Sequence, residues 1–303
     1  MVLQLPFLVI IIFITLPMYA LAYSIELYTP AFSSPEYTKP GCSSRCGGVD
    51  ISYPFGMKDS KCYGGKWFEV ECRKTSHGKK PYLKSLNLEV RGVDLHKVYI
   101  MNPIFHWNCP SRTAKPDVIN LRGSPFVYSQ DSNKFMAIGC NNLAFLQSNG
   151  SNVACCVSIC DDCEKVDDNF NLASEYSCSA RYCCETSLPN YLLEYNATFQ
   201  DFNFNTENYN TVSQNCSYAF ITYRNRLDYS ESNNTDYVLA MLEWEISDNT
   251  LHNSTLQLLS ESDYVSCNRS TQSGTSGWRC DCLEGFYGNP YLAGGCTGVI
   301  SMQ

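Results

Sequence analysis

Basic and aromatic residues are interleaved along one stretch of the chain, from about residue 53 to residue 84. Its basic members are Lys58, Lys61, Lys66, Arg73, Lys74, His77, Lys79, Lys80 and Lys84. Its aromatic members are Tyr53, Phe55, Tyr63, Trp67, Phe68 and Tyr82. A lysine or arginine pairs with a carboxylate, and an aromatic ring packs on the apolar C–H face of a sugar. Together these residue types could bind a sugar that carries a carboxylate.

Within this stretch we assign contacts by residue type. The candidates for carboxylate contacts are Lys58, Lys61, Lys66, Arg73, Lys74, Lys79 and Lys80. The candidates for ring stacking are Tyr53, Tyr63 and Trp67. We expect Phe55 and Phe68 in the core, because large apolar side chains dominate burial in small domains. Tyr63 and Trp67 fit a core role and a stacking role equally well.

The start of the chain indicates entry into the secretory pathway. Residues 1–22 have an apolar core from Phe7 to Ile14 and end on Ala20-Leu21-Ala22, a small-x-small pattern that signal peptidase accepts. We predict a signal peptide there. An uncleaved membrane anchor is the alternative, because the stretch approaches the ~20 residues of a membrane span. We therefore expect a protein secreted to the extracellular space or cell wall, with no membrane span after cleavage. It would lie at the plasma membrane only if the leader stays as an anchor or a longer form exists.

All eighteen cysteines follow this leader, and their even number allows complete pairing in an oxidising compartment. Their connectivity stays open. The disulfide candidates are Cys42, Cys46, Cys62, Cys72, Cys109, Cys140, Cys155, Cys156, Cys160, Cys163, Cys178, Cys183, Cys184, Cys216, Cys267, Cys280, Cys282 and Cys296. Six N-x-[ST] sequons predict a glycosylated surface, at Asn149, Asn196, Asn215, Asn233, Asn253 and Asn268.

Charge is divided along the chain. From Lys39 to Arg122, fifteen Lys/Arg stand against seven Asp/Glu, whereas seven stand against twenty-one from Gly123 to Gln303. Two explanations need no ligand: the halves attract each other, or the charges are scattered and solvated. The functional interpretation is a cationic face that recruits a polyanion, with many weak contacts adding up along a polymer. Outside the cell we expect an acidic polysaccharide as that partner and no nucleic acid.

The remaining pattern predicts a β-rich chain. Leu86, Leu88 and Val90 alternate with polar residues, and a second alternation runs from residue 240 to residue 246, as in half-buried strands. Further strands are expected over residues 66–72, 125–128 and 135–140, and one short helix over Leu188–Tyr195. The predicted fold class is mostly β and disulfide-rich, with short-stranded sheets in two cysteine-rich domains and a truncated EGF-like tail.

The ordered cysteine motifs resemble the ectodomain of plant wall-associated receptor kinases. Cys42 to Cys46, Ile51-Ser52-Tyr53-Pro54-Phe55-Gly56 and the Cys62/Cys72 pair resemble its galacturonan-binding domain. Residues 133–140, 183–189, 216–220 and 242–244 resemble its cysteine-rich associated domain, and Cys280-Asp281-Cys282 through Cys296 resembles its EGF-like entry. The predicted parts are a signal peptide (1–22), a lead-in (23–40), a galacturonan-binding-like domain (41–145), a cysteine-rich associated domain (146–255), a partial EGF-like module (256–298) and a tail (299–303).

The resemblance implies non-catalytic binding of pectic galacturonan. The calcium-type EGF start of that family is missing after Cys296, so we predict no calcium site. The transmembrane and kinase parts are missing too, and signalling is not carried over. The chain could be a truncated product, a splice form or a secreted decoy.

Two other functions remain as alternatives. One is a protein-interaction or decoy module that binds a receptor ectodomain or a secreted peptide. The least favoured is a pectin-cleaving enzyme using carboxylates such as Asp161-Asp162 or Asp167-Asp168, because adjacent side chains on a strand point apart.

No metal or cofactor site is predicted either. The Cys160/Cys163 spacing could suggest zinc, but an oxidising compartment favours disulfides. The histidines, at positions 77, 96, 106 and 252, are scattered outside any metal-binding motif.

Overall fold

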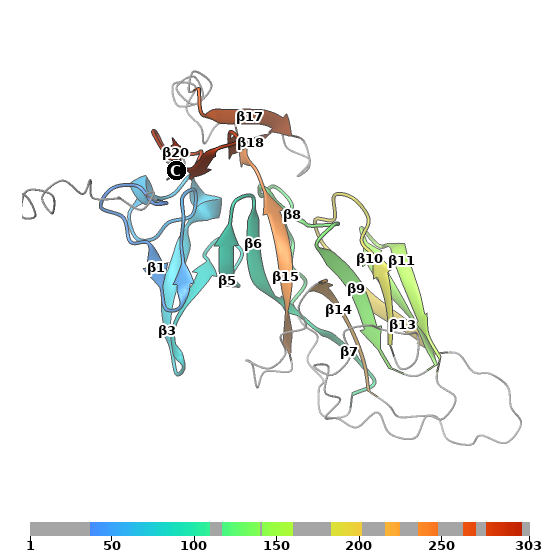
Figure 1. Cartoon of the computed structure of the whole chain (residues 1–303). Helices are drawn as coiled ribbons and strands as arrows, with labels where there is room; N and C mark the ends of the chain where they lie inside the picture. Colours follow the sequence, from blue (N-terminus) through green and yellow to red (C-terminus); the bar gives the residue numbers. More distant parts are fainter. Residues whose placement is uncertain are drawn as a thin grey trace, which may run out of the picture. The chain divides into compact units, whose positions relative to one another are not determined.

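The computed structural model describes residues 37–109, 117–139, 141–159, 183–201, 216–224, 236–247, 263–270 and 277–298. They belong to one compact unit. Short antiparallel strands dominate the described residues (Figure 1). The predicted mostly-β, disulfide-rich fold of short-stranded sheets is confirmed.

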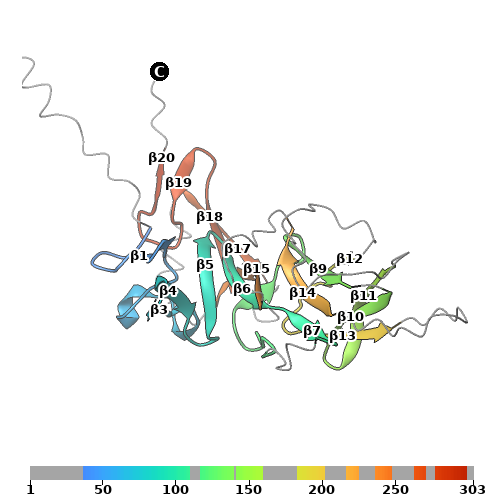
Figure 2. The ribbon, with the colours of Figure 1, turned by 90° about the horizontal axis from the view of Figure 1, so that it is seen from below.

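The largest sheet has six strands in the order β3-β4-β5-β6-β15-β8. Their bounds are β3 (Val70–Thr75), β4 (Gly78–Leu83), β5 (Leu88–Asp94), β6 (Lys97–Pro103), β15 (Tyr237–Trp244) and β8 (Phe126–Tyr128). Strand β15 comes from far along the sequence and lies beside β6 (Figures 1 and 2). Its other edge pairs with β8 (Figure 1). The sheet thus joins strands across the boundary proposed at residue 145. The proposed domain boundaries stay predictions.

Two further sheets lie beyond β15. One has the order β12-β9-β14-β7, with β12 (Cys183–Ser187), β9 (Asn133–Ile138), β14 (Ser217–Tyr223) and β7 (Phe105–Trp107). The other has the order β11-β10-β13, with β11 (Ser151–Ser158), β10 (Asn142–Ser148) and β13 (Asn196–Asp201). The hydroxyl of Thr222 on β14 donates to the carbonyl of Leu239 on β15 at 3.2 Å, which ties the first of these sheets to the six-stranded one.

Small sheets and turns complete the chain. They are β1 (Arg45–Cys46) with β2 (Val49–Asp50), β16 (Ile246–Ser247) with β18 (Gly277–Cys282) and β17 (Val265–Ser270), and β19 (Phe286–Gly288) with β20 (Cys296–Gly298). Two 3-10 turns, η2 (Ser60–Cys62) and η3 (Lys66–Phe68), precede β3. Among the described residues, no helix has the length and apolar character that a membrane span needs.

An aromatic cluster forms the core behind the six-stranded sheet. Phe55, Phe68, Phe126 and Trp244 are each at most 2% exposed. Phe55 and Phe68 meet edge to face, with ring centroids 5.2 Å apart, a favoured aromatic geometry. This confirms the expected core role of Phe55 and Phe68.

Six disulfides cross-link the described residues. They are Cys42–Cys62, Cys46–Cys72, Cys109–Cys216, Cys156–Cys184, Cys267–Cys280 and Cys282–Cys296. Cys183 is disulfide-bonded too. Cys155 departs from the prediction because it is exposed on β11 with a free thiol. Its side chain points away from the face on which its neighbour Cys156 pairs, since successive strand residues point to opposite faces. The predicted cysteines 140, 160, 163 and 178 lie outside the described residues.

The sequons are only partly covered by the described residues. Asn149, Asn196 and Asn268 are exposed, as an accessible glycan acceptor must be. The sequons at 215, 233 and 253 lie outside the described residues, as do the carboxylate pairs at 161–162 and 167–168 and residue His252. Glycosylation stays a prediction.

Candidate cationic site

The tip of the β3–β4 hairpin concentrates positive charge. Lys74 and Lys79 are direct cross-strand partners, and both are exposed. His77 is exposed in the turn between them. We call Lys74, His77 and Lys79 the cationic tip. Like charges placed opposite each other on a sheet are destabilising, so an arriving anion would relieve their repulsion.

Neither lysine of this tip is neutralised internally. Across the described residues, neither Lys74 nor Lys79 forms an ion pair with a carboxylate. Other cations of the same segment have such partners, as described below. The cationic tip is therefore open to an external carboxylate.

Local backbone contacts hold the tip in shape. The hydroxyl of Thr75 donates to the carbonyl of Gly78 at 2.8 Å, and Gly78 has a φ of +105° that favours glycine. Gly47 of the β1–β2 turn lies against the backbone of Lys79, since an added Cβ there would be only 2.1 Å from the Lys79 carbonyl oxygen. The Cys46–Cys72 disulfide fastens the same turn to β3.

On the outer face of the β3–β4 hairpin, the cations are already paired with carboxylates of the fold. Arg73 forms an ion pair with Glu71 at 2.7 Å and lies 4.3 Å from the ring centroid of Tyr82. Lys80 forms an ion pair with Glu89 at 2.9 Å. Arg73 and Lys80 are thus occupied within the fold, and an anionic ligand would have to displace a carboxylate to reach them.

The loop that contains η2 and η3 holds the other selected residues. Lys58 is exposed without an ion pair in the described part of the chain, whereas Lys61 lies 3.5 Å from Asp59. The ammonium of Lys66 lies 4.9 Å from the ring centroid of Trp67. Trp67 and Tyr63 are half-buried and pack against the core cluster, so each presents only part of its ring. Lys84 is held by Glu69 at 2.6 Å.

The Tyr53 ring is too buried for stacking on a sugar. Its side chain is only 7% exposed, and burial raises its pKa. The ammonium of Lys39 lies 4.4 Å from its ring centroid, and burial lowers the pKa of that lysine. We therefore leave Tyr53 out of the sugar contacts. The sequence does not predict a role for Lys39, because its contact with Tyr53 depends on the folded backbone.

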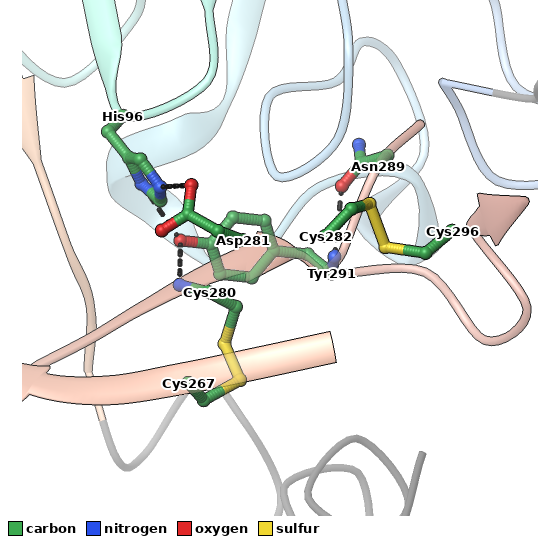
Figure 3. Close-up of a disulfide and its surroundings, with 8 residues drawn as sticks. All are labelled: His96, Cys267, Cys280, Asp281, Cys282, Asn289, Tyr291 and Cys296. Atoms are coloured by element: carbon green, nitrogen blue, oxygen red, sulfur yellow. Dashed lines mark hydrogen bonds and ion pairs between the residues drawn. A yellow bond between two sulfur atoms is a disulfide. The ribbon is translucent and has the colours of Figure 1, made fainter. Parts of the chain in front are cut away.

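The C-terminal residues 277–298 are anchored to the segment that contains Tyr37 and Tyr53. The Asn289 side chain, 3% exposed, donates to the carbonyls of Tyr53 at 2.6 Å and Tyr37 at 3.2 Å. Figure 3 shows Asn289 beside Tyr291 in the segment closed by the Cys282–Cys296 disulfide. Residues near both ends of the described chain are thereby joined.

The structure separates the selected residues into three places. Strand β3 has six residues and a rise of about 3.4 Å per residue, so its two ends are about 17 Å apart. The cationic tip lies at one end, the η2–η3 loop lies at the other, and the paired cations lie on the face between them. A single short ligand cannot reach all three places, whereas a polymer could touch more than one.

The described residues offer no ready metal site. Within them, one His/Cys group is close enough to share an ion, namely His106, Cys109 and Cys216. Cys109 and Cys216 are bonded to each other, so neither is free to act as a thiolate ligand.

Comparison with known proteins shows what this chain is similar to. Residues 42–102 match the family described as wall-associated receptor kinase galacturonan-binding. Three relatives come from Arabidopsis thaliana. Wall-associated receptor kinase-like 10 is 29% identical over 85% of this chain and 39% of its own length. Wall-associated receptor kinase-like 5 is 30% identical over 84% and 38%. Wall-associated receptor kinase 2 is 30% identical over 85% and 34%.

The chain thus spans less than two-fifths of the length of these relatives. No solved structure matches it significantly. The resemblance to wall-associated receptor kinase ectodomains is confirmed, and it supports an extracellular, wall-associated location.

Proposed function

We propose that this chain binds acidic cell-wall polysaccharide of the galacturonan type, without chemical turnover, and that the cationic tip makes the main carboxylate contacts. The match of residues 42–102 to a galacturonan-binding family supports the ligand class. The observation that carries the proposal is the unneutralised cross-strand pair of Lys74 and Lys79. In this proposal the protein is secreted and acts outside the cell.

The chemistry of the tip suits a repeating carboxylate. Each exposed charge contact contributes only about 0.2–1 kcal/mol, so one sugar unit would bind weakly. A chain with a carboxylate on each unit brings a second contact at high effective concentration once the first has formed. Lys58 and Lys66, at the other end of β3, provide further cationic contacts for a longer chain.

The test compares two double variants with the same change in net charge. Lys74→Gln/Lys79→Gln removes the free cations, whereas Lys80→Gln/Lys84→Gln removes two cations that Glu89 and Glu69 already hold. Binding of a demethylated oligogalacturonide is measured by calorimetry in low-salt buffer. We expect the first variant to bind about tenfold more weakly and the second to bind nearly as the wild type does.

Three results would count against the proposal. The wild type could fail to bind the oligomer, the two variants could lose affinity equally, or reducing ends could be released above a heat-inactivated control. Equal losses would indicate attraction by net charge alone. Release of reducing ends would restore the enzyme alternative.

A further inference from the structure

His77 lies in the turn of the β3–β4 hairpin, just beyond the two lysines of the cationic tip. The cross-strand pair of Thr75 and Gly78 closes this turn, and the pair of Lys74 and Lys79 comes next along the hairpin. Successive residues of a strand are about 3.4 Å apart along its axis, so the His77 backbone is only about 7 Å beyond the lysine pair. One ligand carboxylate, or two neighbouring ones, can therefore meet all three side chains.

The hairpin presents these side chains to solvent. Only Tyr82 and Leu83 of β4 pair with β5, so the end of the hairpin that contains the turn extends past the neighbouring strand (Figure 1). Lys74, His77 and Lys79 are all exposed. A polymer can thus approach the tip without displacing any part of the described sheet.

The turn fixes the backbone of His77 but leaves its ring unoccupied. The backbone N–H of His77 donates to the hydroxyl of Thr75 at 3.3 Å, and that hydroxyl donates to the carbonyl of Gly78 at 2.8 Å. In the described part of the chain, the imidazole itself forms no ion pair and no hydrogen bond. When the ring is protonated, both of its nitrogens are donors, and both are available to an external carboxylate.

The charged groups on the elements beside the tip are already paired with one another. The pairs are Arg45 with Asp50 on β1 and β2, Arg73 with Glu71 on β3, and Lys80 and Arg91 with Glu89 on β4 and β5. None of these carboxylates forms an ion pair with His77. Protonation of His77 would therefore raise the uncompensated charge of the tip from two to three.

The other described histidines have different surroundings. His96 contacts Asp281 and the hydroxyl of Tyr291, and His106 lies 3.7 Å from Asp236. Residue His252 lies outside the described residues. Of the described histidines, only His77 belongs to the cationic tip.

We propose that His77 is a third carboxylate contact of the cationic tip, and that its protonation strengthens galacturonan binding as the pH falls. This inference rests on the function proposed above and adds a pH dependence to it. Histidine is the side chain that ordinarily changes its charge between about pH 5 and about pH 8. A bound carboxylate favours the charged imidazole, so binding takes up protons and the affinity rises as the solution becomes more acidic. Carboxylic acids titrate near about pH 4, so the ligand stays charged over this range.

The experiment is a calorimetric titration of the full chain with a demethylated oligogalacturonide in low-salt buffer, at about pH 5.5 and about pH 7.5. We expect the wild type to bind about threefold more tightly at the lower pH, the effect of one exposed charge contact. Near about pH 6.5, titrations in two buffers of different ionisation enthalpy should show uptake of about 0.3 proton per bound oligomer. His77→Asn should bind equally at both pH values. His77→Arg, whose charge is permanent, should bind at both values about as tightly as the wild type does at the lower one.

A control variant separates a contact at the tip from a change in net charge. Tyr191→His in the His77→Asn background places an imidazole where the side chain is 59% exposed and where the φ of +58° is one that histidine tolerates. The next residue, Leu192, accepts a backbone hydrogen bond from Tyr128 of β8, and β8 is at the opposite edge of the six-stranded sheet from β3. We expect this double variant to bind equally at both pH values, as His77→Asn does.

Three results would overturn the inference and leave galacturonan binding itself intact. The wild type could bind equally well at the two pH values, His77→Asn could keep the wild-type difference, or the Tyr191→His double variant could regain it. Absence of binding by the wild type at both pH values would instead reject the proposed function, and this inference with it.

Discussion

His96, in the turn between β5 and β6, is joined to the C-terminal residues 277–298 by two hydrogen bonds. Its Nε2 lies 3.1 Å from Asp281, and its Nδ1 lies 3.1 Å from the hydroxyl of Tyr291 (Figure 3). The Tyr291 hydroxyl also accepts from the backbone N–H of Cys280 at 3.0 Å. A neutral imidazole satisfies this arrangement, because Nε2 donates to the carboxylate while Nδ1 accepts from tyrosine.

Stability should therefore fall as the solution becomes acidic. Burial lowers the pKa of His96, although Asp281 opposes this. The unfolded imidazole then takes up a proton more readily than the folded one, so stability is lost as pH falls from about 6.5 towards the folded pKa. We expect His96→Asn to show a smaller loss of unfolding free energy between about pH 7.5 and about pH 5 than the wild type. Asparagine is chosen because it tolerates the φ of +64° at this position.

The measurement is urea denaturation at both pH values, with His77→Asn as the control. His77 is exposed in the hairpin turn, so its replacement should leave the pH dependence of the wild type unchanged. Identical pH dependence in His96→Asn and the wild type would show that this imidazole is not buried in neutral form.

At the residue scale, the sequence predicts which side chains are basic. It does not predict which of them lack an ion pair within the fold. Residue type alone predicts the basic stretch from Lys58 to Lys84. Whether a lysine is free depends on cross-strand register, which places Lys74 opposite Lys79 but lets Glu89 reach Lys80. A shift of the β3–β4 register by one residue would exchange the paired and unpaired lysines, because side chains alternate between the two faces of a sheet.

At the scale of elements, the loop between β19 and β20 acts as an anchor through Asn289. Replacing this residue by aspartate keeps the acceptor for the N–H of Tyr291, at 3.0 Å, but removes both donors. The new carboxylate oxygen would face the carbonyls of Tyr37 and Tyr53. We expect Asn289→Asp to lower the free energy of unfolding by about 2 kcal/mol or more, the cost of leaving buried polar groups unpaired.

Chemical denaturation tests this prediction, with Asn87→Asp as the matched control. Asn87 is exposed and accepts from Arg73 at 2.7 Å, a role that aspartate keeps. The control should change stability by no more than about 0.5 kcal/mol. Equal denaturation midpoints for Asn289→Asp and the wild type would contradict the anchoring role.

Alternation of apolar and polar residues predicted several strands correctly. Leu88 and Val90 are buried on β5, and residues 240, 242, 244 and 246 are all buried, as expected. The stretch from residue 240 to residue 246 is more than half-buried, however, because Met241 and Glu245 on its other face are buried too. Two predictions were wrong in part or in full. Residues 66–68 form η3, and β3 begins only at Val70. No helix forms over Leu188–Tyr195, where Pro189 and a φ of +58° at Tyr191 interrupt helical geometry.

At the scale of the whole molecule, some cations of the basic segment are paired with acids of the same segment. Arg45, Lys61, Arg73, Lys80 and Lys84 pair with acids from residues 50 to 89. Arg122 reaches into the acidic part of the chain, to Glu194 at 2.9 Å. Attraction between the basic and acidic halves of the chain thus explains part of the charge division. Lys74 and Lys79 still have no ion pair in the described part of the chain.

The most direct test of the central claim is the salt dependence of binding to a demethylated oligogalacturonide. Contacts between free cations and a polyanion release counterions, so the logarithm of the affinity should fall linearly with the logarithm of salt concentration. For Lys74→Gln/Lys79→Gln we predict a slope shallower than the wild type's by about one to two units, while Lys80→Gln/Lys84→Gln keeps the wild-type slope. The same slope for all three proteins, or affinity that does not change with salt, would contradict the account.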